Sequence, residues 1–325
     1  MKPSKLRPVL AAMMLAVALF GAGAALAQDY PNRPIRIVNP YAPGGSTDPV
    51  LRPMIQRMSE LLGQAVFIEN KPGAGTNIGS EIVAKSKPDG YTLLLGTSSL
   101  ASSPSLYKKL NYDPVKDLQP VALLVYAPFT LAVNASLPVK SVQELIDYAH
   151  ANPGKLNYGS AGNGGAIHLG TELFKSMTKT DIVHVPFKGS GEVINALLGG
   201  DIQVALSPAT NFVQHAKAGR VRMLAVASSR RVDGLDLPTF ADVGRPLFVS
   251  GVWMALFAPV GTPKEIIDKL NGAVNIALKE RNIVETYQRI GMVVEGGSAE
   301  DLGRLYLQEV ERWPKIVKEA GLVLD

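Results

Sequence analysis

Short apolar runs alternate with amphipathic segments along most of this chain. The run at residues 34–39 predicts a strand, and apolar residues at helical spacing from Leu51 to Leu61 predict a helix directly after it. Further strands are expected at residues 65–69, 91–95, 121–125, 129–133, 182–185, 202–206, 221–227 and 252–257. Helices are expected in most of the gaps between them. This alternation predicts an α/β fold with mostly parallel sheets.

Three helix starts carry a capping pattern. Ser141 is followed three residues later by Glu144, and Thr262 is followed by Glu265, with a proline between them at the first helical position. Ser298 is followed by Asp301 in the same way. In each case we expect the hydroxyl oxygen to accept a hydrogen bond from a backbone amide at the start of the helix.

A glycine-rich turn separates the first strand from the first helix. Its candidate ligand-binding residues are Tyr41, Pro43, Gly44, Gly45, Ser46, Thr47 and Asp48. The two glycines permit positive φ and close approach of a ligand, and a helix N-terminus offers free amides to an anion. Ser46, Thr47 or Asp48 can cap the helix. Asp48 has two open roles, as a cap or as a contact to a ligand amine or hydroxyl.

A second glycine-rich turn precedes a helix expected to begin near Ala166. Its candidates are Ser160, Ala161, Gly162, Asn163, Gly164 and Gly165. His168 falls in the first turn of that helix, where it either lines a cleft or stabilises the turn. Ligands of α/β folds bind at the carboxyl ends of strands. If the two turns belong to different domains, a small acid fits between them, with further candidates in other loops after strands, namely Thr97, Ser98, Phe187 and Ser207.

The amino-terminal segment has the pattern of a secretory signal peptide. Lys2, Lys5 and Arg7 precede an apolar run at residues 9–20, and Ala25-Leu26-Ala27 forms a small-residue cleavage site. We expect cleavage near Ala27, so that residues 1–27 are removed. An uncleaved membrane anchor is the alternative, because apolar and small residues continue over nearly the length that spans a bilayer.

Composition and motif spacing argue against several classes of function. The chain has no cysteine, which excludes disulfides and thiol chemistry. Without its first 27 residues it has 30 basic and 28 acidic residues, scattered singly, so no nucleic-acid partner is indicated. The four histidines lack metal-motif spacing, and we expect no metal and no cofactor. There is no Gly-x-Ser-x-Gly elbow, and residues 73–79 do not fit a dinucleotide fingerprint, so an enzyme is not expected.

Several segments, in order along nearly the whole chain, resemble one family. They are YPNRPIRIV at 30–38, PGGSTD at 43–48, ENKPGAGTNIG at 69–79, KPDGYTLL at 87–94, LYKKL at 106–110, YDP at 112–114, YGS at 158–160, HVPFKG at 184–189 and LLGG at 197–200. On these residues the chain is similar to Bug-type periplasmic solute-binding proteins, the TctC-like receptors of tripartite tricarboxylate transporters.

This resemblance implies a two-lobed periplasmic binding protein fold (type II), with the ligand in the cleft between lobes. Each lobe has a central sheet flanked by helices, and the chain crosses between lobes twice. By analogy, lobe 1 comprises residues 28–125 plus 250–325, and lobe 2 residues 126–249. Family members hold a carboxylate with backbone amides, hydroxyls and water from the two glycine-rich loops. The family's usual residues are absent near Ser103 and Ser207, which leaves the ligand's identity open.

The function implied is capture of a small organic acid in the periplasm of a Gram-negative bacterium. The receptor would then deliver the acid to integral membrane transporter subunits. Presentation of the ligand to a sensor kinase is one alternative, and an enzyme acting on a small acid is another.

Overall fold

The computed structural model describes residues 30–228, 231–246, 248 and 250–319. The expected signal peptide at residues 1–27, with its cleavage site, lies outside these residues. No helix in the described part of the chain is long and apolar enough to cross a membrane.

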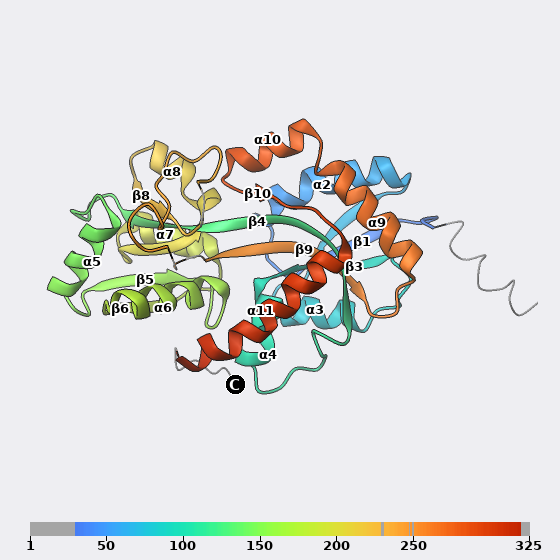
Figure 1. The fold of residues 1–325 in the computed structure, drawn as a ribbon, viewed down its shortest axis with the longest axis horizontal. Coiled ribbons are helices and arrows are strands. Elements are labelled where there is room, and N and C mark those ends of the chain that lie inside the picture. The colour runs from blue at the N-terminus through green and yellow to red at the C-terminus, as the bar shows by residue number, and fades with distance from the viewer. Residues whose placement is uncertain (1–29, 229–230, 247, 249, 320–325) are drawn as a thin grey trace, which may run out of the picture.

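Strands and helices alternate along the chain (Figure 1). The strands are β1 (Ile35–Asn39), β2 (Val66–Asn70), β3 (Thr92–Thr97), β4 (Leu118–Asn134), β5 (Leu156–Ser160), β6 (Ile182–Pro186), β7 (Val204–Pro208), β8 (Val221–Val226), β9 (Gly251–Pro259) and β10 (Val293–Val294). The helices are α2 (Asp48–Leu62), α3 (Asn77–Ala84), α4 (Ser98–Leu106), α5 (Val142–Ala151), α6 (Ala166–Thr178), α7 (Ser190–Gly199), α8 (Val213–Lys217), α9 (Lys264–Ala277), α10 (Arg281–Arg289) and α11 (Ala299–Glu319). Two short 3₁₀ turns are η1 (Ala74–Thr76) and η2 (Ala209–Asn211).

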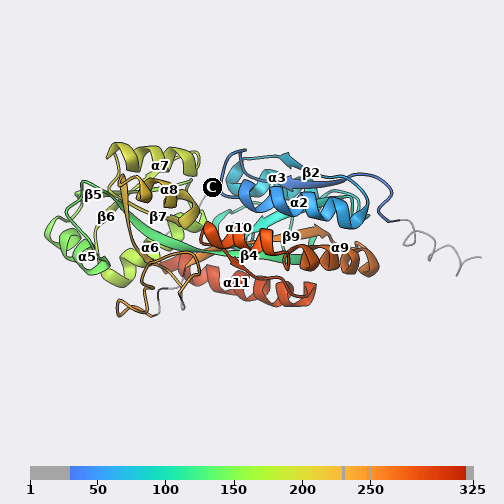
Figure 2. The same ribbon diagram turned by 90° about the horizontal axis from the view of Figure 1, so that it is seen from above.

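The long strand β4 joins two halves of one twisted sheet (Figure 2). The strand order is β2-β1-β3-β9-β4-β7-β5-β6, and β8 and β10 also pair with β4. Strands β1, β2 and β3 are parallel in one half, and β5, β6 and β7 are parallel in the other. This arrangement gives two α/β lobes connected through their sheets.

The expectation of mostly parallel sheets is wrong. Every pairing made by β4 and β9 is antiparallel. These two strands carry the chain from one lobe to the other and back, so each runs against its neighbours. The strands expected at 121–125 and 129–133 are one continuous strand, β4, which passes through Ala127-Pro128 without a break. Strand β5 was not predicted, because its sequence LNYGS lacks an apolar run.

Two of the three capping predictions are confirmed. The Glu144 amide donates to Ser141 Oγ at 3.1 Å, and the Asp301 amide donates to Ser298 Oγ at 3.1 Å. The prediction at Thr262 is wrong, because α9 begins after Pro263 and the Thr262 hydroxyl instead donates to the Pro259 carbonyl at 2.8 Å.

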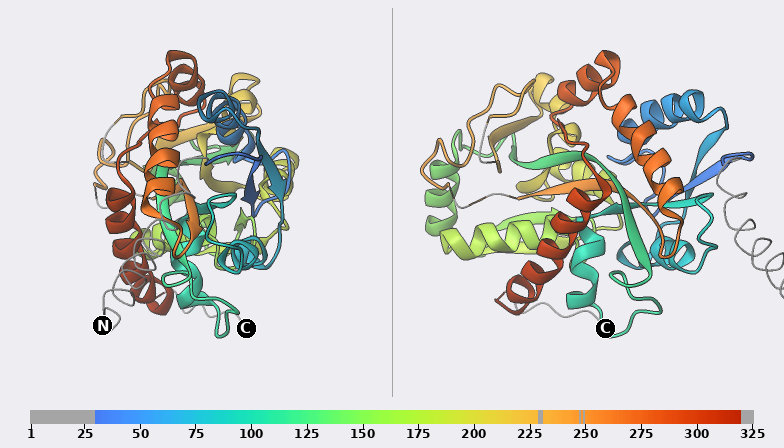
Figure 3. Two further views of the ribbon diagram at one scale, coloured as in Figure 1. Left: turned by 90° about the vertical axis from the view of Figure 1, so that its right-hand side faces the viewer. Right: turned by 45° about the vertical axis from the view of Figure 1, so that its right-hand side comes forward.

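Helices cover both faces of the lobe 1 sheet, and its strands alternate between them. Ile37 packs in a cluster with residues of α2, α9 and α10, whereas its neighbour Val38 packs with residues of α3, α4 and α11. Leu93 and Leu94 divide in the same way. The period of two along each strand therefore builds two hydrophobic layers. Helix α11 crosses the sheet diagonally and reaches toward lobe 2 (Figure 3).

Gly251 sits where the returning strand β9 begins, tightly packed against β4. A Cβ at this position would lie 2.6 Å from Tyr126 Cζ and 2.7 Å from the Ala127 carbonyl oxygen. Gly251→Ala is therefore expected to lower the free energy of unfolding by about 1–3 kcal/mol, measured by urea denaturation.

Gly272→Ala is the matched control. Gly272 lies inside α9 with nothing within 4 Å of an added Cβ, and alanine is favoured over glycine in a helix by about 1 kcal/mol. If the urea midpoint falls equally in both variants, close packing around Gly251 is not the reason for the loss of stability.

Candidate functional site

The carboxyl ends of both sets of parallel strands meet near the middle of β4. Thr97, the last residue of β3, pairs with Met254 of β9, which pairs with Val125 of β4. Pro208, the last residue of β7, pairs with Phe129 of the same strand. Val125 and Phe129 are four residues apart on β4, which is about 13 Å at the usual rise of a strand. The loops that follow β1, β3, β5 and β7 are thus brought to one region, with one set from each lobe.

The first loop is tied to the end of β3. The Tyr41 hydroxyl and Thr97 Oγ1 are 2.8 Å apart, and Asn70 Nδ2 donates to the Tyr41 carbonyl at 2.8 Å. Thr97 Oγ1 also accepts a hydrogen bond from the Ser99 amide and so caps α4. The structure therefore brings together two of the predicted site residues, Tyr41 and Thr97, from loops far apart in sequence.

Asp48 stabilises the first loop rather than capping the helix. Its Oδ2 accepts a hydrogen bond from the Gly44 amide at 3.0 Å and pairs with Arg52 at 3.3 Å. No side chain caps α2, which corrects the expectation for Ser46, Thr47 and Asp48. Of the two glycines, Gly44 has positive φ, at +81°, whereas Gly45 does not.

Three successive amides in this loop are left without partners. In the described residues, no hydrogen bond is made by the backbone N–H of Gly45, Ser46 or Thr47. The Thr47 hydroxyl oxygen accepts from Asn39 Nδ2 at 3.0 Å, whereas the Ser46 hydroxyl has no partner within the described chain. Pro43 and Gly44 are exposed at the loop's tip. The amides precede a helix, where the backbone dipole also favours an anion.

The second loop has the same character. Within the described chain, the backbone N–H groups of Ala161, Gly162, Asn163 and Gly165 donate no hydrogen bond. Ala161 and Asn163 are exposed, and α6 follows without a side-chain cap. The remaining amide of this loop, that of Gly164, donates a hydrogen bond to His168 Nδ1 at 2.9 Å. His168 thus stabilises the turn, one of its two predicted roles, and is itself buried.

Two stacked histidines, the buried His168 and the half-buried His184, lie at this loop, and the sequence analysis did not find the pair. The rings of His168 and His184 stack with centroids 3.8 Å apart, and Tyr158 stacks on His184 at 4.8 Å. Ser160 Oγ contacts both the Gly162 carbonyl at 2.8 Å and His184 Nε2 at 2.7 Å. No motif spacing links the histidines, because the contact depends on the pairing of β5 with β6.

The hydrogen bonds place a proton on Nε2 of both histidines and leave Nδ1 of His168 unprotonated. Ser160 has one proton, which it donates to the Gly162 carbonyl, so His184 Nε2 is the donor to Ser160. His168 Nδ1 accepts from the Gly164 amide, so its proton is on Nε2. Burial, followed by the neighbouring His184, lowers the pKa of His168 to about 4, and burial also lowers the pKa of His184. The second glycine-rich loop therefore donates a hydrogen bond to an imidazole that is uncharged at neutral pH.

This arrangement predicts loss of stability in mild acid. The unfolded state binds a proton on His168 below about pH 6.5, whereas the folded state resists it until about pH 4. The free energy of unfolding should therefore be fully retained above pH 6.5 and fall as the pH drops from there toward 4. His184, Glu172, Lys175 and Tyr158 surround the ring, and of the two charged groups Glu172 opposes the shift while Lys175 adds to it.

Urea denaturation between pH 7.5 and 4.5 measures this slope. His168→Asn, which keeps an acceptor for the Gly164 amide but does not titrate, is expected to show a shallower loss of stability than the native chain. Identical slopes in the two proteins would refute the assignment of a neutral His168.

Of the remaining candidates, Phe187 lies beside the second glycine-rich loop, where its amide donates to the Ser160 carbonyl at 2.9 Å. Ser98 is buried, and its Oγ accepts from the Trp253 amide at 3.1 Å. Phe187 is half-buried over Gly159, and Ser207 Oγ accepts from Asn211 Nδ2 at 2.7 Å. Ser103, where the sequence departs from the family, is buried and donates to the Ser99 carbonyl. In this arrangement the hydroxyls of these serines are engaged within the protein.

No metal centre is visible among the described residues, since no three His, Asp or Glu side chains gather in a suitable group. Neither glycine-rich loop contains an arginine or lysine. What the two loops offer is a set of uncharged N–H donors at the start of two helices. This chemistry suits an oxyanion such as a carboxylate.

The chain is also similar to known proteins. Residues 50–322 match the family model described as "Tripartite tricarboxylate transporter family receptor". The chain is similar to the protein BugT of Bordetella pertussis, with 36% identity over 97% of this chain and 98% of the relative.

Two solved structures extend the similarity to the fold. One is Rpa4515 of R. palustris with adipate, with a TM-score of 0.86 and 37% identity over 91% of this chain and 99% of that one. The other is the periplasmic binding protein BugD, with a TM-score of 0.83 and 35% identity over 90% and 99% of the two chains.

Proposed function

Because the chain belongs to the tripartite tricarboxylate transporter receptor family, we propose that it binds a small organic carboxylate between its two lobes. The two glycine-rich loops would hold the carboxylate, with Gly45 to Thr47 on lobe 1 and Ala161 to Gly165 on lobe 2. The lobe boundaries predicted from the sequence, 28–125 plus 250–325 and 126–249, are part of this proposal. The role is that of a binding receptor rather than an enzyme.

One observation supports this most strongly. Unpaired amides occur in both loops, and the strand register brings the ends of those strands to the middle of β4. Hydrogen bonds from amides to a charged oxygen contribute about 1.5–3 kcal/mol each, because the acceptor is ionised. Adipate in the related Rpa4515 structure is a carboxylate of the kind that such donors suit.

Delivery to a transporter is the second part of the proposal. A secreted receptor of this family would close its lobes on the acid in the periplasm, and integral membrane subunits would recognise the closed form. Neither the family description nor the related structures point to a sensor kinase. Deleting the membrane-subunit genes should abolish uptake of the acid and leave binding by the purified receptor intact. Unchanged uptake would contradict delivery.

Thermal shift against carboxylates tests binding directly. Malonate, succinate, malate, adipate and benzoate are the probes, at pH 7.5. A ligand that binds only the folded state stabilises it by about 2.7 kcal/mol at a hundredfold excess over Kd, so at least one acid should raise the Tm with concentration. Adipamide is the uncharged control for adipate. A set of acids that leaves the Tm unchanged, or an equal shift with adipamide when adipate is the binder, would refute carboxylate recognition.

A further inference from the structure

The second glycine-rich loop contains Asn163-Gly164, one of two Asn-Gly pairs in the sequence. Asparagine is thermolabile, because the backbone nitrogen of the next residue can attack its side-chain amide. Glycine in the second position favours this reaction, since it has no Cβ to obstruct the approach. Asn163 is exposed, and within the described chain its side-chain amide makes no hydrogen bond. Nothing therefore holds this side chain away from the Gly164 nitrogen.

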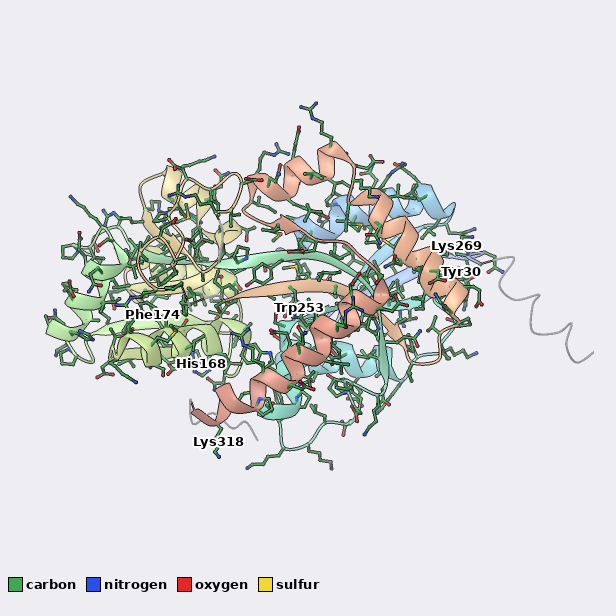
Figure 4. The ribbon with its side chains drawn as sticks, viewed as in Figure 1. Tyr30, His168, Phe174, Trp253, Lys269 and Lys318 are labelled. Carbon is green, nitrogen blue, oxygen red and sulfur yellow. The ribbon has the colours of Figure 1, made fainter. Side chains whose placement is uncertain are left out.

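The attacking nitrogen of this pair is in contact with a base. The Gly164 N–H donates to His168 Nδ1 at 2.9 Å, and both residues are buried. Backbone amides mostly donate to carbonyl oxygens, which take up no proton at neutral pH, whereas a neutral imidazole nitrogen can do so. Burial lowers the pKa of His168 to about 4, so Nδ1 is unprotonated at neutral pH. Figure 4 shows His168 at the end of α6 that lies toward the middle of the molecule.

We propose that Asn163 is a modification site, which deamidates spontaneously with His168 as the general base. The Gly164 nitrogen forms a bond to Asn163 Cγ and passes its proton to His168 Nδ1. The side-chain nitrogen of Asn163 then takes up that proton and leaves as ammonia, and a five-membered succinimide remains. Water from the solvent opens this ring at either carbonyl carbon, so position 163 becomes aspartate or isoaspartate. No atom is oxidised or reduced, and water is the only co-reactant.

The other Asn-Gly pair, Asn271-Gly272, is an internal control. It lies inside α9, where the backbone amide of residue 272 donates to a carbonyl of the helix. The Asn271 side chain is held as well, because its Nδ2 donates to the Val121 carbonyl at 2.8 Å and its Oδ1 accepts from Asn275 Nδ2 at 2.9 Å. The same dipeptide is thus restrained at one position and unrestrained at the other.

Deamidation would change the charge of the proposed carboxylate site. The new carboxylate stands among the unpaired amides of Ala161 to Gly165, where it repels a bound acid and competes for those donors. This consequence rests on the proposed function, whereas the chemical step does not. Asn163→Asp should therefore bind the best acid of the panel about tenfold more weakly than the native chain, and Asn163→Gln about as tightly. Equal affinity in the two variants would overturn the consequence for binding.

Peptide mapping by mass spectrometry tests the modification itself, without any ligand. In native protein kept at pH 7.5, Asn163 should be converted about tenfold faster than Asn271, because only Asn163 has a base at the attacking nitrogen. In guanidinium chloride the two pairs should react at similar rates, with Asn163 slower than in the folded chain. Unfolding that accelerates Asn163, or leaves its rate unchanged, would overturn the proposal.

His168→Asn separates the base from the exposure of the loop. This variant keeps an acceptor for the Gly164 amide but has no group that takes up a proton. Conversion of Asn163 should slow about tenfold, and conversion of Asn271 should stay the same. An unchanged or faster rate at Asn163 would overturn the role of His168. The comparison of folded and unfolded native chain decides the same point if the variant does not fold.

Discussion

Gly45→Ile is expected to reduce carboxylate affinity by about 100-fold or more. The unpaired amides of Gly45, Ser46 and Thr47 can approach a ligand because no side chain stands in front of the first of them. A β-branched side chain at that position covers them, and the loss of two charge-assisted hydrogen bonds costs about 3–6 kcal/mol. Isothermal titration with the best acid of the panel measures the effect.

Gly45→Ala is the control for this variant. The backbone at Gly45 is not in the left-handed region, and an added Cβ would lie 3.5 Å from the Ala42 carbonyl oxygen, which is an ordinary contact. The alanine variant should fold normally and bind within a few-fold of the native chain. If the isoleucine variant binds as well as the alanine variant, the first loop does not hold the ligand.

His168→Leu is expected to weaken carboxylate binding about tenfold. His168 lies below the second loop and accepts the Gly164 amide, so it positions the neighbouring amides without facing the ligand. Leucine leaves the Gly164 N–H buried without an acceptor, at a cost of about 1–3 kcal/mol, and the loop relaxes away from its binding geometry.

His168→Asn distinguishes positioning from mere packing. Asn carries an acceptor oxygen near the place of Nδ1, so it should recover most of the affinity, although it fills the space above His184 less well than the imidazole. Titration of the same acid at pH 7.5 gives the comparison. Equal affinity losses in the two variants would show that the hydrogen bond to Gly164 has no role in binding.

Much of the fold could be predicted from the sequence because buried residues recur at a regular spacing along each strand and helix. Residues such as Ile37 and Val38 alternate between two helix-covered faces, and apolar residues of α2 recur on one face. The error in strand direction came from β4 and β9. Nothing in an apolar run shows which way its neighbours run, so crossover strands cannot be told from parallel ones by composition.

The free amides of the glycine-rich loops could be predicted from local sequence, because a turn between a strand and a helix leaves amides without partners. The contact between the two histidines could not be predicted in this way. His168 and His184 meet because β5 lies beside β6 and α6 packs over them, which is a tertiary arrangement. The engagement of Ser98, Ser103 and Ser207 within the protein was missed for a similar reason, because a hydroxyl's partner depends on the final packing.

A crystal structure with the tightest-binding acid of the panel tests the central claim most directly. We expect the carboxylate oxygens within about 3 Å of amide nitrogens from Gly45 to Thr47 and from Ala161 to Gly165, so that both lobes contribute. A carboxylate held instead by an arginine or lysine side chain, or bound away from the two glycine-rich loops, would contradict the account.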